Sequence, residues 1–136
     1  MALFIWTDAL RTGNRHIDDD HRLLVEHVNT VLECIAQRAD NARLCQALDA
    51  LGIYTRTHFA QEEDLMRKAG YARTHEHCAQ HQALLEQMEQ VMAQLRTHQT
   101  IDPMDLYTRL TRWVVEHIQQ YDRDFVQSEP AQAHAD

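Results

Sequence analysis

Pairs of metal-binding side chains spaced four residues apart constrain this chain more than any other feature of its sequence. Glu62 follows His58 at this spacing, and His81 follows His77. On an α-helix, positions four apart lie about 40° apart on one face and one turn further along. Each pair can therefore direct two side chains at one point. Two such pairs on successive antiparallel helices predict a metal centre in the core of a helical bundle.

The composition favours a helical protein with a single domain spanning residues 1–136. Charged residues make up 25% of the chain and apolar residues 44%, with only three Gly and two Pro, which is typical of a soluble and largely helical protein. The net charge of −8 argues against binding to nucleic acids or anionic membranes. No segment approaches the roughly 20 apolar residues of a membrane span. Three cysteines without framework spacing favour a reducing cytoplasm.

Apolar residues at helical spacing predict four helices. Their expected ranges are 19–38, 41–69, 73–97 and 103–127. Short connections between helices of this length predict an all-α fold, an up-down-up-down antiparallel four-helix bundle. The second helix is expected to bury a stripe that runs through His58 and Glu62 to Leu65.

The predicted helix ends rest on capping signals. Asp40 and the Asp102-Pro103 pair are typical helix starts, and Gly70 is a typical stop. Residues 1–18 are expected to form a non-helical arm that packs Trp6 and Ile17 against the bundle. Three aspartates at 18–20 suit the start of the first helix, because carboxylates cap the free amides and favour the positive end of its dipole. Residues 128–136 are expected to form a short tail.

Five histidines and two carboxylates fall on or beside the predicted inward faces. They are His21, His58, Glu62, His77, His81, His117 and Asp122. A single inward histidine is usually a hydrogen-bonded core residue, but burying all seven groups without partners would cost several kcal/mol per group. Imidazole suits iron, copper and zinc, and shared carboxylates draw two cations together. Asp122 lies about 140° around an ideal helix from His117, so we expect the side chain to reach across or the helix to form a π-bulge there.

The chain resembles the bacterial hemerythrins over essentially its whole length. The motifs that carry the resemblance are Trp6, Gly13, Ile17-Asp18, His21 to Leu24, His58-Phe59, Glu62-Glu63, Met66, Tyr71, His77, His81, Trp113, His117-Ile118 and Asp122. The resemblance implies a non-haem diiron site that binds O2 reversibly, in a carrier, store or delivery protein.

The resemblance also implies how the two iron ions (Fe2+/Fe3+) are held. Three histidines would hold one iron and two the other, with both carboxylates and an oxo or hydroxo bridge between them. The three-histidine set is His77, His81 and His117, the two-histidine set is His21 and His58, and the bridging residues are Glu62 and Asp122. The two-histidine iron keeps an open position for O2. Trp113, Val114 and Ile118 are expected to wall the O2 pocket, because each lies within a turn of His117.

The remaining chemistry-bearing residues are expected to have lesser parts. His16, His27, His75, His98 and His134 lie off the inward stripes and are read as solvated. Glu63 is expected to face a partner helix or solvent, and Cys78 to fill space. Asp20 stands where the family often has Gln; we expect it to cap the first helix, although an inward carboxylate could raise the basicity of His21. Tyr54 and Tyr121 are candidates for hydrogen bonds to the site, with packing favoured.

Other functions remain open at this point. A diiron centre can also reduce peroxide or nitric oxide, and O2 or iron occupancy can signal to a separate partner. Zinc or manganese would fit the same spacing, and only the resemblance favours iron. A histidine-rich site favours reversible binding over oxidation, so an O2-binding protein is preferred to an enzyme. We expect a monomer that binds O2 and delivers it to a separate O2-using protein.

Overall fold

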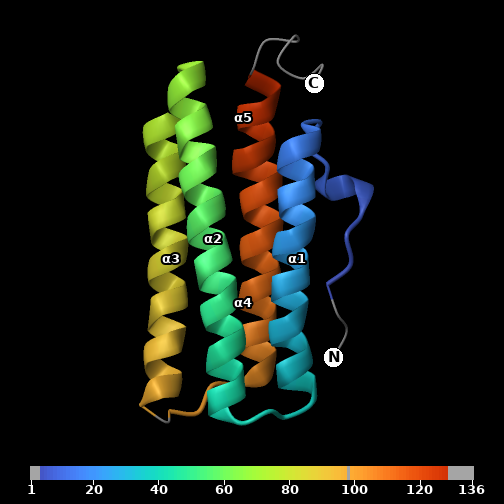
Figure 1. Cartoon of the computed structure of the whole chain (residues 1–136), viewed down its shortest axis with the longest axis vertical. Coiled ribbons are helices and arrows are strands. Elements are labelled where there is room, and N and C mark those ends of the chain that lie inside the picture. The colour runs from blue at the N-terminus through green and yellow to red at the C-terminus, as the bar shows by residue number, and fades with distance from the viewer. Residues whose placement is uncertain (1–3, 98, 129–136) are drawn as a thin grey trace.

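Four antiparallel helical columns form the molecule (Figure 1). The computed structural model describes residues 4–97 and 99–128, and these contain helices and no β-strand. The elements in chain order are the 3-10 turn η1 (Asp8–Leu10), α1 (Arg15–Ala36), α2 (Asn41–Ala69), α3 (Thr74–Arg96), α4 (Pro103–Glu116), the π-helix η2 (His117–Asp122) and α5 (Arg123–Ser128). The prediction of an all-α four-helix bundle is confirmed. Within the described ranges, no helix is both long and apolar enough to cross a membrane.

Most helix ends follow the capping signals in the sequence. The Asp40 side chain accepts a hydrogen bond from the Arg43 amide at 2.9 Å, and Asp102 accepts one from the Met104 amide at 3.0 Å. Gly70 ends α2 at φ +68°, a conformation that costs glycine little because it has no Cβ. As a result α2 spans the predicted range, and α3 and α4 begin within one residue of theirs.

The start of the first helix was predicted wrongly. Asn14 is the cap residue and accepts a hydrogen bond from the Ile17 amide at 3.0 Å, so α1 begins at Arg15 and the aspartates at 18–20 lie inside it. Residues 1–18 are therefore not a wholly non-helical arm. Asp18 is buried and accepts two hydrogen bonds of 2.8 Å, from the amide and the hydroxyl of Thr12. This carboxylate ties the chain before α1 to the helix, a contact between segments that no capping rule anticipates.

The fourth column is continuous but changes its winding where the metal-binding residues lie. Its α-helical winding gives way to a π-helix over His117–Asp122. The Arg123 amide donates to the carbonyl of Ile118, five residues earlier, and this longer step widens the turn. Of the two alternatives expected for Asp122, the π-bulge is the one that the structure shows. The wider turn brings Asp122, the fifth residue after His117, toward the face of the helix that carries His117.

Apolar side chains pack into two clusters on either side of the predicted metal-binding residues. The larger cluster includes Leu24, Leu51 and Leu110, and the smaller one consists of Ile17, Met66, Phe125 and Val126. His21 lies between Ile17 and Leu24 along α1, and Asp122 lies just before Phe125 in the fourth column. The polar layer is therefore sealed by apolar packing on both sides. Leu65, expected on the buried stripe of α2, is instead 42% exposed.

We predict that Asp18→Ala destabilises the fold by about 2 kcal/mol, because it leaves two buried donors of Thr12 without their charged acceptor. Asp19→Ala is the matched control, since Asp19 is exposed on the same turn of α1; it should change stability by less than about 0.5 kcal/mol. Chemical denaturation of both variants measures the difference. Equal stability of the two variants would contradict the structural importance of the Asp18 contact.

Candidate metal centre

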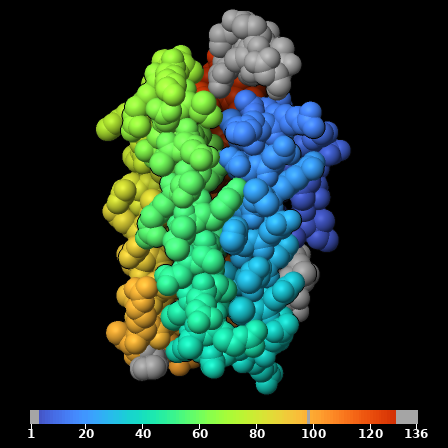
Figure 2. Space-filling view, viewed as in Figure 1, coloured from blue at the N-terminus to red at the C-terminus, as the bar shows by residue number. Residues whose placement is uncertain are grey.

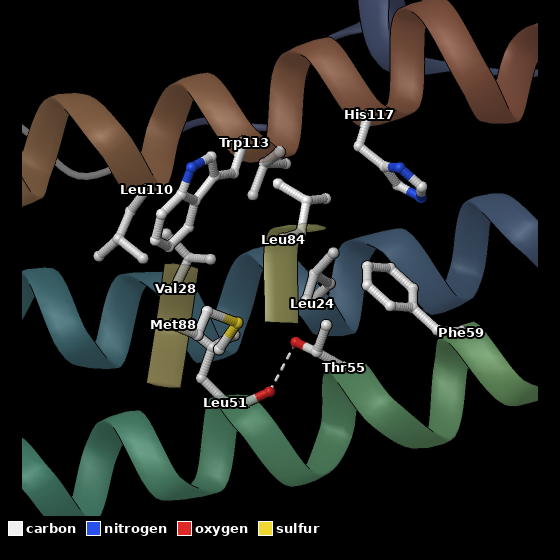
Figure 3. Close-up of a pocket in the computed structure, with 11 residues that line it drawn as sticks. Leu24, Val28, Leu51, Thr55, Phe59, Leu84, Met88, Leu110, Trp113 and His117 are labelled. Carbon is white, nitrogen blue, oxygen red and sulfur yellow. Dashed lines mark hydrogen bonds between the residues drawn. The ribbon is translucent and has the colours of Figure 1, made fainter. Parts of the chain in front are cut away.

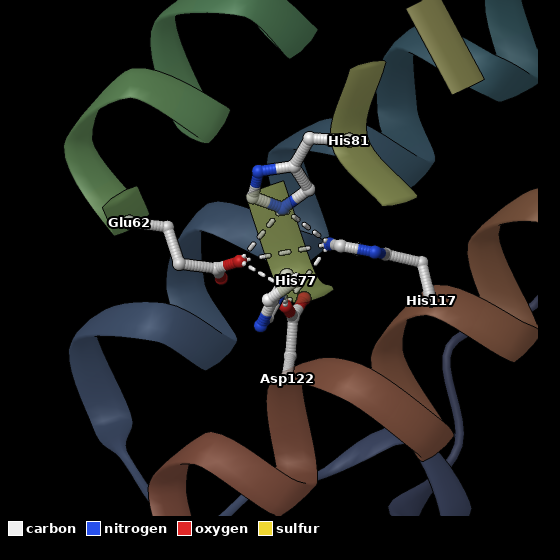
Figure 4. A group of neighbouring side chains, drawn as sticks. All are labelled: Glu62, His77, His81, His117 and Asp122. Carbon is white, nitrogen blue, oxygen red and sulfur yellow. Dashed lines mark hydrogen bonds and ion pairs between the residues drawn. The ribbon is translucent and has the colours of Figure 1, made fainter. Parts of the chain in front are cut away.

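All seven side chains expected at the metal site converge in one layer of the bundle. Five of them form one group whose ligand atoms lie within 4.8 Å of one another: Glu62, His77, His81, His117 and Asp122 (Figure 4). His21 and His58 form a second group with the same two carboxylates, again within 4.8 Å. All seven residues are buried. The two groups therefore overlap at Glu62 and Asp122.

The two carboxylates divide their oxygens between the histidine sets. Oε1 of Glu62 lies 2.9 Å from His77 Nε2 and 3.0 Å from His81 Nε2, while its Oε2 faces His58 Nε2 at 3.7 Å.

Asp122 repeats this arrangement from the opposite column. Its Oδ1 lies 3.1 Å from His77 Nε2 and 3.0 Å from His117 Nε2, and its Oδ2 lies 2.7 Å from His21 Nε2. Each carboxylate thus offers one oxygen to each side, which is the geometry needed to share two cations.

The donor atoms fit a metal better than they fit one another. Among the described residues, Nε2 of His21, His58 and His77 and both oxygens of Asp122 have no hydrogen-bond partner. These atoms are close together without the geometry of a hydrogen bond. Buried polar atoms left unsatisfied cost about 1–3 kcal/mol each, and more when charged. Cations placed between them would satisfy nitrogen lone pairs and carboxylate oxygens together, and this donor set suits iron, copper or zinc.

Without a metal, the opposing charges hold one another in their ionised forms. Burial raises the pKa of Glu62, but the imidazoles of His117, His77 and His81 outweigh it and lower the pKa to about 2. Burial lowers the pKa of His117, but the carboxylates of Asp122 and Glu62 raise it to about 10. In the metal-free centre a protonated His117 therefore faces the ionised carboxylate of Glu62. A metal bound by His117 would have to displace that proton.

Three of the histidines have a polar partner at Nδ1, on the side away from the centre. His81 donates to Oε2 of Glu63 at 2.8 Å, and His117 donates to Oε1 of Gln80 at 2.6 Å. A neutral ring that carries its proton on Nδ1 leaves Nε2 free to bind a metal. Glu63 faces the partner helix α3, one of the two alternatives expected for it, and contacts His81 there. Gln80 was missed altogether. The only indication of these contacts in the sequence is that Glu63 follows Glu62 and Gln80 precedes His81.

The third partner is Asp20, which corrects another expectation. It does not cap α1; its Oδ2 lies 3.6 Å from Nδ1 of His58, and its backbone carbonyl accepts a hydrogen bond from the Tyr54 hydroxyl at 3.0 Å. The neighbouring His58 ring lowers the pKa of the Asp20 carboxyl, against the opposing effect of burial. The Asp20 carboxylate therefore lies beside His58. An inward Asp20 was expected to act on His21 instead.

An apolar cavity of about 40 Å³ lies beside His117 (Figure 3). Trp113 and Val114 line it, but Ile118 does not; its side chain is fully buried elsewhere in the larger apolar cluster. The other lining residues are Leu24, Val28, Leu51, Thr55, Phe59, Leu84, Met88 and Leu110. The Thr55 hydroxyl is occupied by the Leu51 carbonyl at 2.6 Å. Most of these wall residues were missed because they come from all four columns and none is itself polar enough to mark a site.

The remaining histidines lie outside the cluster. His16 and His75 are exposed, as expected, while His27 is half-buried with its ring 4.9 Å from that of Tyr54. His98 and His134 lie outside the described residues. The ring of Tyr121 packs 5.5 Å from that of His77, in keeping with the packing part expected for it.

Comparisons with known proteins agree with this geometry. The family model described as the hemerythrin HHE cation binding domain matches residues 12–127. A bacteriohemerythrin of Pseudomonas paraeruginosa is 31% identical over 126 residues, which cover 93% of this chain and 81% of that protein. A bacteriohemerythrin of Methylococcus capsulatus is 31% identical over 124 residues, covering 90% of this chain and 94% of that protein.

Solved structures give the same result. A crystal structure of wild-type hemerythrin superposes with a TM-score of 0.84 at 28% identity, covering 93% of this chain and 97% of that one. A crystal structure of a hemerythrin mutant gives the same TM-score and coverage at 29% identity. Sequence, fold and the overlapping clusters of histidines and carboxylates lead to one conclusion: this chain belongs to the hemerythrin HHE cation-binding domain family.

Proposed function

We propose that this chain binds O2 reversibly at a diiron centre, in which Glu62 and Asp122 bridge the two ions. The observation that carries the proposal is the division of the carboxylate oxygens. Each carboxylate has one oxygen against the three-histidine set and one against the two-histidine set. A single-metal site has no need for this arrangement. The proposal assigns His77, His81 and His117 to one ion and His21 and His58 to the other.

The chain's own side chains supply the binding, orientation and charge for this function. Two ferrous ions would supply the electrons that reversible O2 binding requires. Five neutral imidazoles and two carboxylates leave the centre less anionic than a carboxylate-rich site, and net charge is one of the factors that set the potential of an iron centre. A site of this kind favours reversible binding over oxidation chemistry. Glu63 and Gln80 keep the rings of His81 and His117 oriented with Nε2 toward the metal.

The apolar cavity beside His117 supports O2 as the ligand. Its volume of about 40 Å³ exceeds that of one water molecule on the same measure, yet its apolar walls give water too few partners to be held. O2 is small and apolar and loses no hydrogen bonds on entering such a space. The ring of Phe59, stacked on His81 with centroids 3.7 Å apart, extends the apolar wall toward the centre.

The direct test is to add O2 to the anaerobically reduced, iron-loaded protein, purge with argon and record absorption spectra throughout. A new charge-transfer band that appears with O2 and fades on purging is expected. Rapid and irreversible oxidation without that band would instead favour the alternative, a diiron enzyme that reduces peroxide or nitric oxide. Stable iron loading with no response to O2 would leave only a metal-binding protein, with sensing through a separate partner as its candidate function.

We predict that His117→Ala lowers metal affinity at the three-histidine position by about 100-fold, or about 2.8 kcal/mol. It should also remove most of the rise in melting temperature that metal binding produces. His75→Ala is the matched control, because His75 lies on α3 but is exposed and outside the cluster. Metal content after dialysis and thermal melts measure both effects. Full iron content and an unchanged melting temperature in His117→Ala would contradict its assignment as a ligand.

Filling the cavity should slow access of O2. We predict that Leu84→Phe reduces the O2 association rate by about tenfold, a barrier of about 1.4 kcal/mol, while leaving the iron content unchanged. Leu85→Phe is the control, since Leu85 is half-buried and does not line the cavity. Flash photolysis or stopped-flow mixing with O2 measures the rates. Equal rates in the two variants would show that O2 reaches the centre by another path.

The metal-free protein should lose stability as the pH rises above about 6.5. The raised pKa of His117, about 10 against the usual 6.5, contributes stability that is fully present below 6.5 and is lost as the pH rises through about 10. The lowered pKa of Glu62, about 2 against 4.5, contributes stability that is present above 4.5 and is lost as the pH falls through about 2.

Bound metal should reverse the alkaline trend, because ligation requires neutral imidazoles and therefore strengthens as the pH rises. Thermal melts of the metal-free and metal-loaded protein at about pH 6 and about pH 9 test this difference. The gap between the two melting temperatures should widen at the higher pH. A gap that narrows would contradict the description of His117 as protonated in the metal-free centre.

A further inference from the structure

A pocket of about 260 Å³, lined mostly by polar residues, lies between α1 and α2, on the two-histidine side of the proposed centre. The helices α1 and α2 lie side by side on the face turned toward the viewer in Figure 2. From α1 the pocket is lined by His16, Ile17 and Asp20, and from α2 by His58, Gln61, Glu62, Asp64 and Leu65. It therefore joins solvent to two of the seven residues assigned to the metals.

The polar groups of this pocket become more buried toward the centre. At the outside, Asp64 is exposed and paired with Lys68 at 2.9 Å. The side chain of Asp20 is 27% exposed and lies 3.6 Å from the ring of His58. At the inner end, His58 is 3% exposed and Glu62 is 2% exposed. Nε2 of His58 and Oε2 of Glu62 lack a hydrogen-bond partner among the described residues, so they can bind a cation that arrives through the pocket.

Among the described residues, neither the apolar cavity nor three further surface pockets offer a comparable path. The cavity beside His117 is walled by apolar side chains, and moving a divalent ion out of water into such surroundings costs many kcal/mol. The surface pockets between α3 and α4 and at the two ends of the bundle are lined by none of the seven residues. A hydrated cation would therefore meet its ligands first in the pocket between α1 and α2.

We propose that this pocket is the path by which divalent cations load the centre, and that Asp20 is a transit ligand on that path. The inference rests on the proposed metal centre and adds a site outside it. The Asp20 carboxylate attracts a cation to the mouth of the pocket. It then binds the ion briefly beside His58, and the ion passes inward to His58 and Glu62. Because Asp20 is not one of the seven final ligands, it governs the rate of loading rather than the number of ions bound.

The test uses metal-free protein and Co2+, whose absorption reports binding, in a stopped-flow experiment. Asp20→Asn should reduce the association rate constant about fivefold at about 0.01 M ionic strength. The deficit should shrink at about 1 M, where the screening length falls from about 30 Å to about 3 Å. Asp19→Asn is the matched control, because it removes the same charge from the next residue, which is exposed and outside the pocket. Both variants should bind as many Co2+ ions as the unaltered chain.

A second pair of variants guards against a structural effect of replacing Asp20. Gln61→Lys adds a positive charge at the mouth of the pocket and should slow loading, whereas Ala60→Lys adds it at an exposed neighbour outside the pocket and should not. If the unaltered chain binds two Co2+ and the members of each pair load equally fast, the path is overturned while the metal centre stands. If the unaltered chain binds no Co2+, the metal centre itself is overturned, and the path with it.

Discussion

Two buried carboxylates set against five imidazoles are the constraint on which the rest of this structure depends. Neither the carboxylates nor protonated imidazoles are stable alone in an apolar core. The two sets of side chains meet only if all four columns place their residues in the same layer of the bundle. The apolar clusters on either side hold that layer in place. The ion pairs stabilise the metal-free chain, but they leave several donor atoms unsatisfied. Cations placed between the carboxylate oxygens would satisfy these atoms.

The π-helix over His117–Asp122 lets the fourth column contribute both residues to the metal-binding layer. In a regular α-helix, His117 and Asp122 would point in directions about 140° apart. The wider turn over His117–Asp122 lets both enter the same layer. Asp122 then reaches His21 across the bundle with one oxygen, and His77 and His117 with the other. The irregular winding persists here because the contacts between the charges that it brings together outweigh the loss of regular helix.

Helical periodicity was enough to predict the bundle and to place the five histidines and Glu62 on inward faces, because each depends on spacing within one helix. The spacing of Asp122 from His117 left two alternatives open, and the π-bulge is the one observed. Contacts between segments were not predictable in this way. The start of α1 was misplaced because Asp18, Asp19 and Asp20 resemble capping residues, whereas Asp18 binds Thr12 and Asp20 faces His58. Glu63 was expected to face a partner helix or solvent, but its contact with His81 was not predicted. Gln80 was missed, because its contact depends on how each helix is rotated about its axis. The cavity walls likewise come from several helices at once.

The most direct test of this account is an iron-edge anomalous diffraction experiment on crystals of the reduced, iron-loaded protein. The account predicts two anomalous peaks separated by about 3.5–4 Å, each within bonding distance of one oxygen of Glu62 and one of Asp122. One peak should contact His77, His81 and His117, and the other His21 and His58. A single peak, or two peaks that do not share the carboxylates, would contradict the bridged diiron centre.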